Sequence, residues 1–159
     1  MDLLSASRRA VCFVRVSRAG IRLGAGITWV ALAGTVGALG MLGHRRDGMI
    51  AAFVAGGHSL LPQLASSAAA AIGLMIHGLW IAAWSILFAA FMQRDRRSHA
   101  AIPAAVIALV AFAVSLLLPQ AIVGPLATLS TAERGLVHVV LAVSLALGMR
   151  LAPRGDGAR

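Results

Sequence analysis

Four long apolar stretches dominate this chain of 159 residues and leave little sequence between them. They cover residues 23–42, 67–92, 100–118 and 131–151. A helix needs about 20 residues to cross a hydrocarbon layer of about 30 Å, and each stretch reaches or approaches that length. The pattern predicts an all-α integral membrane protein, built as a four-transmembrane-helix bundle with no separate soluble domain.

The composition favours a lipid bilayer over nucleic acid as the surroundings of this chain. Hydrophobic residues make up 60% of it, against about 45–50% in soluble domains. Its net charge of +9 comes from fourteen arginines against five acidic residues, and the arginines lie almost wholly outside the apolar stretches. Nucleic-acid binding would require base-stacking aromatics beside those charges, and tyrosine is absent. We therefore expect no nucleic-acid partner. The use of arginine without lysine and the many alanines suggest a bacterial genome of high GC content, so we expect the membrane to be a bacterial inner membrane.

The arginines also predict the orientation of the chain, because short loops rich in Lys and Arg stay in the cytoplasm. With four spans and a cytoplasmic amino terminus, eleven arginines lie inside, and only Arg45, Arg46 and Arg134 lie outside. Both ends, a basic tail over residues 1–22 and a short tail over residues 152–159, are then cytoplasmic. The loop arginines Arg94, Arg96 and Arg97 are expected to contact anionic lipid head groups.

A fifth apolar run, Met49 to Leu64, is interrupted by Gly56, Gly57, His58 and Pro62. It is shorter than a comfortable span. Counting it as a crossing would place six arginines inside and eight outside, which contradicts the charge rule. The run is therefore predicted to be an interfacial or re-entrant segment on the outer face.

Helix boundaries are marked by capping signals. Ser130 and Glu133 have the spacing of a capping box, which predicts that the last helix starts near Thr131. Ser66 and Ser67 are candidates to cap the second span. The connection over residues 120–129 is largely apolar, so we expect it to lie on the bundle rather than extend into water.

Small residues on the first span suggest close helix packing. Gly26, Gly34 and Gly37 recur with alanines at spacings of three and four, which lets helix backbones approach in lipid. This face has two interpretations: a surface for a second copy or a membrane partner, or an internal contact. Each span also contains a hydroxyl group, and these are expected to bond back to a carbonyl one turn earlier: Thr35, Ser85, Ser115 and Ser144.

Two histidines within the spans are the main candidates for chemistry, because ionisable residues inside a membrane are costly. His77 lies about 15 Å along the second predicted helix and His138 about 10 Å along the fourth. Both helices run from outside to inside in the predicted topology, which places the imidazoles at similar heights. They are candidate ligands for a haem iron or a transition metal, with His58 as a possible third metal ligand. The alternative is that each histidine is a hydrogen-bonded packing residue.

Glu133 and Arg134 are candidates for a polar gate at the outer end of the last helix, against the alternative that Glu133 serves the capping box. The sequence has no recognisable catalytic triad, phosphate loop or carboxylate pair, so an enzyme is unsupported. The leading hypothesis is an accessory or interaction subunit. Two alternatives are a small-solute or ion transporter with a polar path near His77 and His138, and a haem- or metal-binding redox protein that uses the same histidines.

Overall fold

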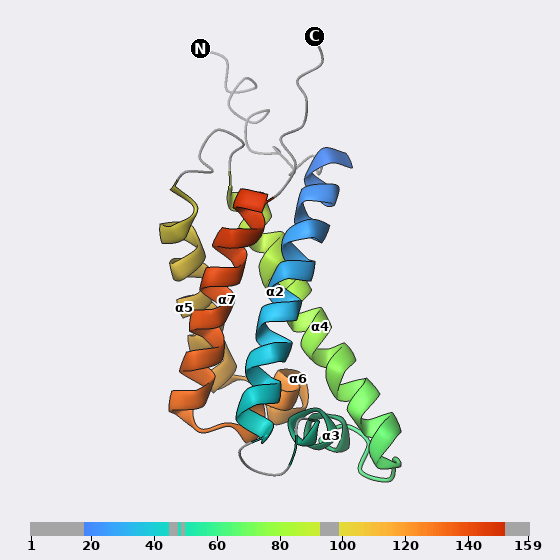
Figure 1. The fold of residues 1–159 in the computed structure, drawn as a ribbon. Coiled ribbons are helices and arrows are strands. Elements are labelled where there is room, and N and C mark those ends of the chain that lie inside the picture. The colour runs from blue at the N-terminus through green and yellow to red at the C-terminus, as the bar shows by residue number, and fades with distance from the viewer. Residues whose placement is uncertain (1–17, 45–47, 49, 93–98, 152–159) are drawn as a thin grey trace, which may run out of the picture.

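The computed structural model describes residues 18–44, 48, 50–92 and 99–151, and every regular element in this part of the chain is a helix (Figure 1). In chain order, the elements are α2 (Arg18–His44), α3 (Ala51–His58), α4 (Ser66–Phe91), α5 (Ala101–Leu117), α6 (Gln120–Val123), the 3-10 helix η2 (Gly124–Thr128) and α7 (Thr131–Leu151). No strand occurs among these residues, so the all-α prediction is confirmed.

Three segments are long and apolar enough to cross a membrane: Leu23–Gly43 within α2, all of α4 and all of α7. A shorter apolar helix, α5, accompanies them. The observed bounds of α4, α5 and α7 agree with the predicted stretches to within one residue at each end. Helix α2 begins five residues before the predicted start, so residues 18–22 are helical. The remainder of the amino-terminal tail, the loop arginines Arg94, Arg96 and Arg97, and residues 152–159 lie outside the described residues.

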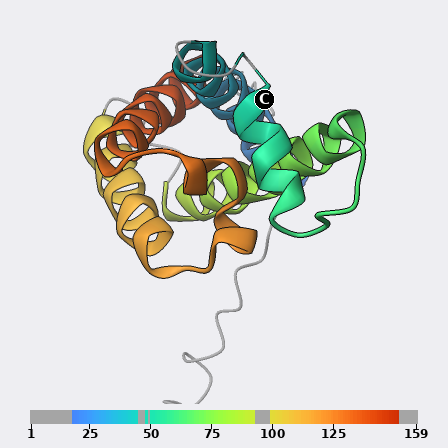
Figure 2. The same cartoon turned by 90° about the horizontal axis from the view of Figure 1, so that it is seen from below.

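Helices α2, α4, α5 and α7 run alternately up and down (Figure 1). Helix α2 packs against α4 and α7, and α5 packs against α7 and more lightly against α4. Seen along the bundle, α4 and α7 therefore occupy diagonal positions and run in the same direction (Figure 2). A side chain that faces inward from α4 and one that faces inward from α7 approach each other across the interior.

Two buried apolar clusters fill the bundle, one at each end. The first lies where α4 and α7 finish and contains Phe88, Leu145 and Met149. The second lies where α2 finishes and α7 begins, and it contains Leu39 and Val137. A buried layer between these clusters is thus separated from both ends of the bundle by hydrophobic side chains.

Helix α3 lies across the end of the bundle and packs on α4 through glycines (Figure 1). A Cβ atom at Gly73 would overlap the backbone carbonyl of Phe53, and one at Gly57 would overlap the carbonyl of Ala69. The two helix backbones are therefore in direct contact, which only glycine permits. With eight residues, α3 is about 12 Å long, too short to cross a bilayer.

The apolar connection after α5 folds back onto the bundle, as predicted. Val123, Leu126 and Leu129 are buried in it. Gly124 has a φ of 59°, and a Cβ there would lie 2.8 Å from the Ile76 side chain. Glycine at this position allows a backbone turn that other residues rarely adopt and leaves room for α4.

The capping box at the start of α7 is confirmed, whereas the serine cap predicted for α4 is wrong. The Ser130 amide donates to the Glu133 carboxylate at 2.9 Å, and the Glu133 amide donates to the Ser130 hydroxyl at 3.3 Å. In α4, Ser66 is already the first helical residue. The N-cap is Ala65, which has no side chain to accept a hydrogen bond.

Candidate buried histidine site

His77 lies on the inward face of α4 and is fully buried. Its Nε2 atom is 2.9 Å from the hydroxyl oxygen of Thr35 in α2. The Thr35 hydroxyl donates its only proton to a backbone carbonyl, that of Ala31 at 2.9 Å. Its oxygen can then only accept, so Nε2 of His77 carries the proton and donates. The other ring nitrogen, Nδ1, is left with a free lone pair.

The ring of His77 is also held from the side of α3. The ring centroid of Phe53 lies 6.1 Å from that of His77, and the two planes are inclined by 72°. This edge-to-face arrangement is a favoured geometry for neighbouring rings. Because α3 rests directly on the backbone of α4, the position of Phe53 depends on the glycine contact at Gly73.

His138 is buried on α7 and is oriented in a similar way. Its Nδ1 atom lies 2.7 Å from the carbonyl oxygen of Arg134, one turn earlier in the same helix. A carbonyl can only accept, so Nδ1 carries the proton and Nε2 keeps a free lone pair. The ring of Phe112 in α5 packs against His138 at a centroid distance of 5.5 Å, inclined by 66°.

The two histidines therefore present matching free nitrogens to the bundle interior. Nδ1 of His77 and Nε2 of His138 are both buried without a hydrogen-bond partner among the described residues. A buried polar atom that lacks a partner costs about 1–3 kcal/mol, and such atoms are normally matched by a water or a ligand. These lone pairs can accept a hydrogen-bond donor or a metal ion.

Three further polar atoms on α4 are buried without a partner in the described part of the chain: the indole Nε1 atoms of Trp80 and Trp84, and the hydroxyl of Ser85. They follow His77 along the same side of the helix. Ser85 thus differs from the predicted pattern, whereas Thr35 and Ser115 do bond back to carbonyls, Ser115 to Phe112 at 2.7 Å. The inward side of α4 therefore carries several polar atoms whose hydrogen-bond partners are not found among the described residues.

The candidate gate residues at the start of α7 are engaged in backbone contacts. The Arg134 guanidinium donates to three carbonyls, those of Ser115 at 3.2 Å, Ala127 at 3.0 Å and Leu129 at 3.3 Å. It joins the end of α5 to η2 and to the residue before the α7 cap. Glu133 belongs to the capping box. Their contacts are those of a structural clamp, and Arg134 also places the carbonyl that orients His138.

His58, the proposed third metal ligand, lies at the end of α3. Its Nε2 atom is 3.0 Å from the carbonyl oxygen of Leu64, so it donates there and closes the turn between α3 and α4. In the described part of the chain, no three His, Cys, Asp or Glu side chains come together in a way that could hold a metal. His58 therefore does not join His77 and His138, and the candidate site consists of the two histidines.

The small-residue face of α2 is divided between the interior and the exterior. A Cβ at Gly34 would meet the Ser144 side chain of α7, so Gly34 belongs to an internal contact. Gly26 and Gly37 are exposed, and a Cβ at either position would have no atom of another element within 4 Å. The three glycines do not share one surface, and the exposed pair alone does not specify a partner.

The sequence points to both histidines but not to the residues that orient them. It identifies Thr35 only as a helix hydroxyl, and Phe53 and Phe112 carry no signal that links them to the histidines. Comparison with protein-family models, with curated proteins and with solved structures finds no match.

Proposed function

We propose that the chain crosses the bacterial inner membrane four times, with both termini in the cytoplasm. The direction of the helices supports a fourth crossing: α4 and α7 run the same way, and α5, which follows α4 and precedes α7 in the chain, runs in the opposite direction (Figure 1). At 17 residues, α5 is about 26 Å long, a few Å less than the hydrocarbon layer, and a local thinning of the bilayer accommodates such a difference. The distribution of eleven arginines against three supports the orientation.

Reporter fusions test this topology. A reporter at Arg159 and one in the 94–98 loop are both expected to read cytoplasmic. Cysteines introduced at Ser59 and Ser66, on either side of the turn after α3, are expected to be labelled from outside. An external signal from either fusion, or labelling of the two cysteines from opposite sides, would contradict the four-span arrangement.

Within this bundle, His77 and His138 are proposed to bind one transition metal ion through Nδ1 and Nε2, respectively. The observation that carries this proposal is the pair of buried lone pairs, each left free because the other ring nitrogen is committed to Thr35 or Arg134. Neutral imidazole is the commonest metal ligand in proteins. Hydrogen bonds from the second ring nitrogen are the usual means of orienting it.

The surroundings favour a cation of low charge. Both ligands are neutral, and Glu133, the one acidic residue in the described part of the chain, is held in the capping box at the start of α7. Transferring charge into a low-dielectric interior is costly, and more so for a divalent ion than for a monovalent one. Imidazole suits zinc, copper, iron and nickel, and of these copper has an accessible monovalent state. Cuprous copper therefore matches the site best.

The packing favours a bound ion over an open transport path. His77 and His138 lie between the two apolar clusters, so a path along the bundle axis would have to pass Phe88 and Leu145 on one side and Leu39 and Val137 on the other. Each imidazole is also packed against a phenylalanine ring. The site is enclosed in this conformation, as expected for a resident ligand.

Metal loading of the purified protein in detergent tests the proposal. Anaerobic addition of cuprous ion, followed by removal of excess and elemental analysis, is expected to give one copper per chain. His77→Leu and His138→Leu should each abolish retention, and the double variant should be no worse than either. His99→Leu is the matched control, because His99 is exposed just before α5 and its loss should leave full loading.

A positioning variant separates orientation from ligation. Thr35→Val removes the acceptor of His77 Nε2 and should weaken copper affinity about 10–100-fold without changing the stoichiometry at saturation. Equal retention by the wild type and both leucine variants would overturn the proposal. So would a preparation that retains no added metal, and the interaction-subunit hypothesis would then stand in its place. A Soret band in the absorption spectrum would also overturn the proposal, because the histidines would then bind haem rather than a metal ion.

A further inference from the structure

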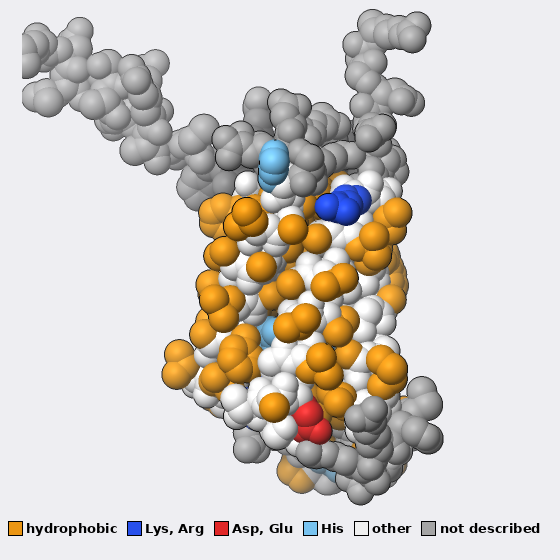
Figure 3. Space-filling view, turned by 60° about the vertical axis from the view of Figure 1, so that its left-hand side comes forward, with side chains coloured by type: hydrophobic (Ala, Val, Ile, Leu, Met, Phe, Trp, Pro, Cys, Tyr) orange, Lys and Arg blue, Asp and Glu red, His pale blue; other side chains and the backbone are white. Residues whose placement is uncertain are grey.

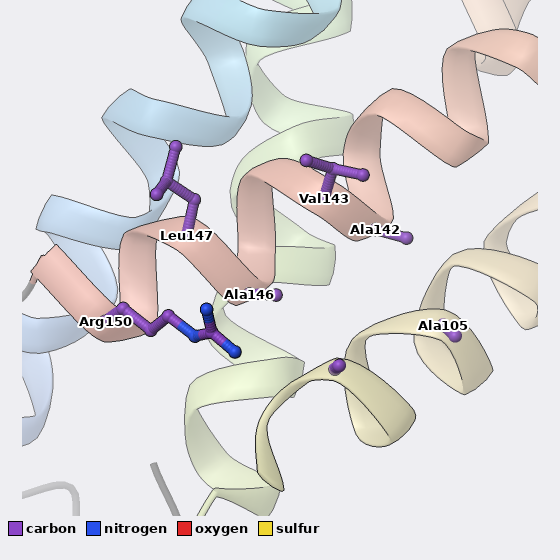
Figure 4. Close-up of a pocket in the computed structure, with 7 residues that line it drawn as sticks. Ala105, Ala142, Val143, Ala146, Leu147 and Arg150 are labelled. Atoms are coloured by element: carbon purple, nitrogen blue, oxygen red, sulfur yellow. The ribbon is translucent and has the colours of Figure 1, made fainter. Parts of the chain in front are cut away.

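A groove runs between α5 and α7 at the end of the bundle where α7 finishes (Figure 4). Its volume is about 400 Å³. Alanines line it on both sides, Ala101 and Ala105 from α5 and Ala142 and Ala146 from α7. Because these side chains are short, they leave the groove open between two helices that are otherwise packed together.

The groove opens on the outward face of the bundle. Ala101 and Ala105 are exposed, and the surface over α5 and α7 is hydrophobic along most of its length (Figure 3). In a membrane, this face contacts lipid acyl chains. The groove is thus a concave, apolar site that lipid can reach directly from the bilayer.

One charged side chain stands at the end of the groove. Arg150 lies in the last turn of α7, is exposed, and extends over the space between α7 and α5 (Figure 4). Of the five acidic residues of the chain, only Glu133 lies in the described part. It is 17 residues earlier on α7, about 26 Å away. No carboxylate in the described ranges is therefore placed to neutralise Arg150.

We infer that this groove binds an anionic phospholipid, with an acyl chain along the alanines and the phosphate at the Arg150 guanidinium. The apolar groove matches the acyl chain of such a lipid, and the guanidinium of Arg150 at its end matches the phosphate. Basic pockets between transmembrane helices are a known mode of recognising anionic head groups, and guanidinium binds phosphate oxygens in a bidentate manner. Neither histidine lines the groove, so lipid binding here is independent of metal binding at His77 and His138.

Native mass spectrometry of the full-length protein in detergent, with equal amounts of phosphatidylglycerol and phosphatidylcholine, tests the inference. We expect one phosphatidylglycerol to be retained in preference to phosphatidylcholine. Arg150→Gln should weaken phosphatidylglycerol binding about fivefold and remove the preference, because one arginine near an anionic head group contributes about that factor. Arg150→Lys keeps the charge and should keep the preference.

A second pair of variants tests the apolar part of the site. Ala105→Leu fills the groove from an exposed position and should reduce retention of both lipids. Ala90→Leu, at an exposed alanine of α4, is the matched control and should have no effect. Helical circular dichroism verifies that each variant is folded.

Several results would overturn the inference. Equal retention of the two lipids by the wild type, or an unchanged preference in Arg150→Gln, would mean that the guanidinium does not select the lipid. Displacement of phosphatidylglycerol by inorganic phosphate, insensitive to Ala105→Leu, would indicate a simple anion site. A dimer that carries no lipid and dissociates in Ala105→Leu would show that a second copy occupies the groove.

Discussion

The contact between α3 and α4 predicts opposite effects of the same substitution at two glycines of one helix. In Gly73→Ala, the new methyl group would overlap the backbone carbonyl of Phe53, and a backbone cannot move aside as a flexible side chain can. In Gly78→Ala, five residues further on, the methyl group enters open space. Helix α3 must therefore shift in the first variant and stay in place in the second.

The size of the effect is the difference in free energy of unfolding between the two variants. Alanine gains about 0.5–1 kcal/mol over glycine in a helix interior, and both variants share this gain. Overpacking typically costs about 1–3 kcal/mol, and only Gly73→Ala incurs that cost. Gly73→Ala should thus be less stable than Gly78→Ala by about 1–3 kcal/mol, while Gly78→Ala equals or exceeds the wild type.

Reversible unfolding in mixed micelles of increasing sodium dodecyl sulfate content, followed by helical circular dichroism, measures this difference. The Phe53 ring, which packs on His77, should move together with α3. Copper affinity should then fall in Gly73→Ala and remain unchanged in Gly78→Ala. Equal stability of the two variants would refute the direct backbone contact between α3 and α4, and with it the proposed support of His77 from that side.

Three other contacts give predictions about the stability of the fold. Arg134→Gln leaves backbone carbonyls of α5 and η2 without their charged donor and should destabilise the fold by about 2–3 kcal/mol in the same unfolding assay; Arg134→Lys should not restore it, because an ammonium group cannot reproduce the forked geometry. Ser130→Ala removes one half of the capping box and should cost about 1 kcal/mol, with metal binding unaffected. Gly124→Ala forces an L side chain to a φ of 59° and against Ile76, and should cost at least about 1–2 kcal/mol; a neutral result would mean that this turn does not keep its conformation in the membrane.

Features that depend on residues close together in the chain could be predicted from the amino-acid sequence alone. The bounds of the helices could be predicted from runs of apolar residues. A helix in lipid satisfies its own backbone hydrogen bonds, so its extent does not depend on a distant partner segment. The start of α7 followed from Ser130 and Glu133, which are three residues apart. The connection after α5 is itself apolar, and this local property predicts that it is buried on the bundle without identifying the residues that it contacts.

Which surfaces of these helices meet depends instead on the tertiary structure. Gly34 and Gly37 belong to the same small-residue pattern, yet one packs against α7 and the other is exposed. Lipid removes the hydrophobic drive that marks an inner face in soluble helices, so apolar periodicity does not distinguish the two. The partner of His77 is Thr35, 42 residues away, and Arg134 reaches a carbonyl 19 residues away. Contacts at such separations depend on how closely two backbones approach, which is set by packing in three dimensions and leaves no local pattern in the chain.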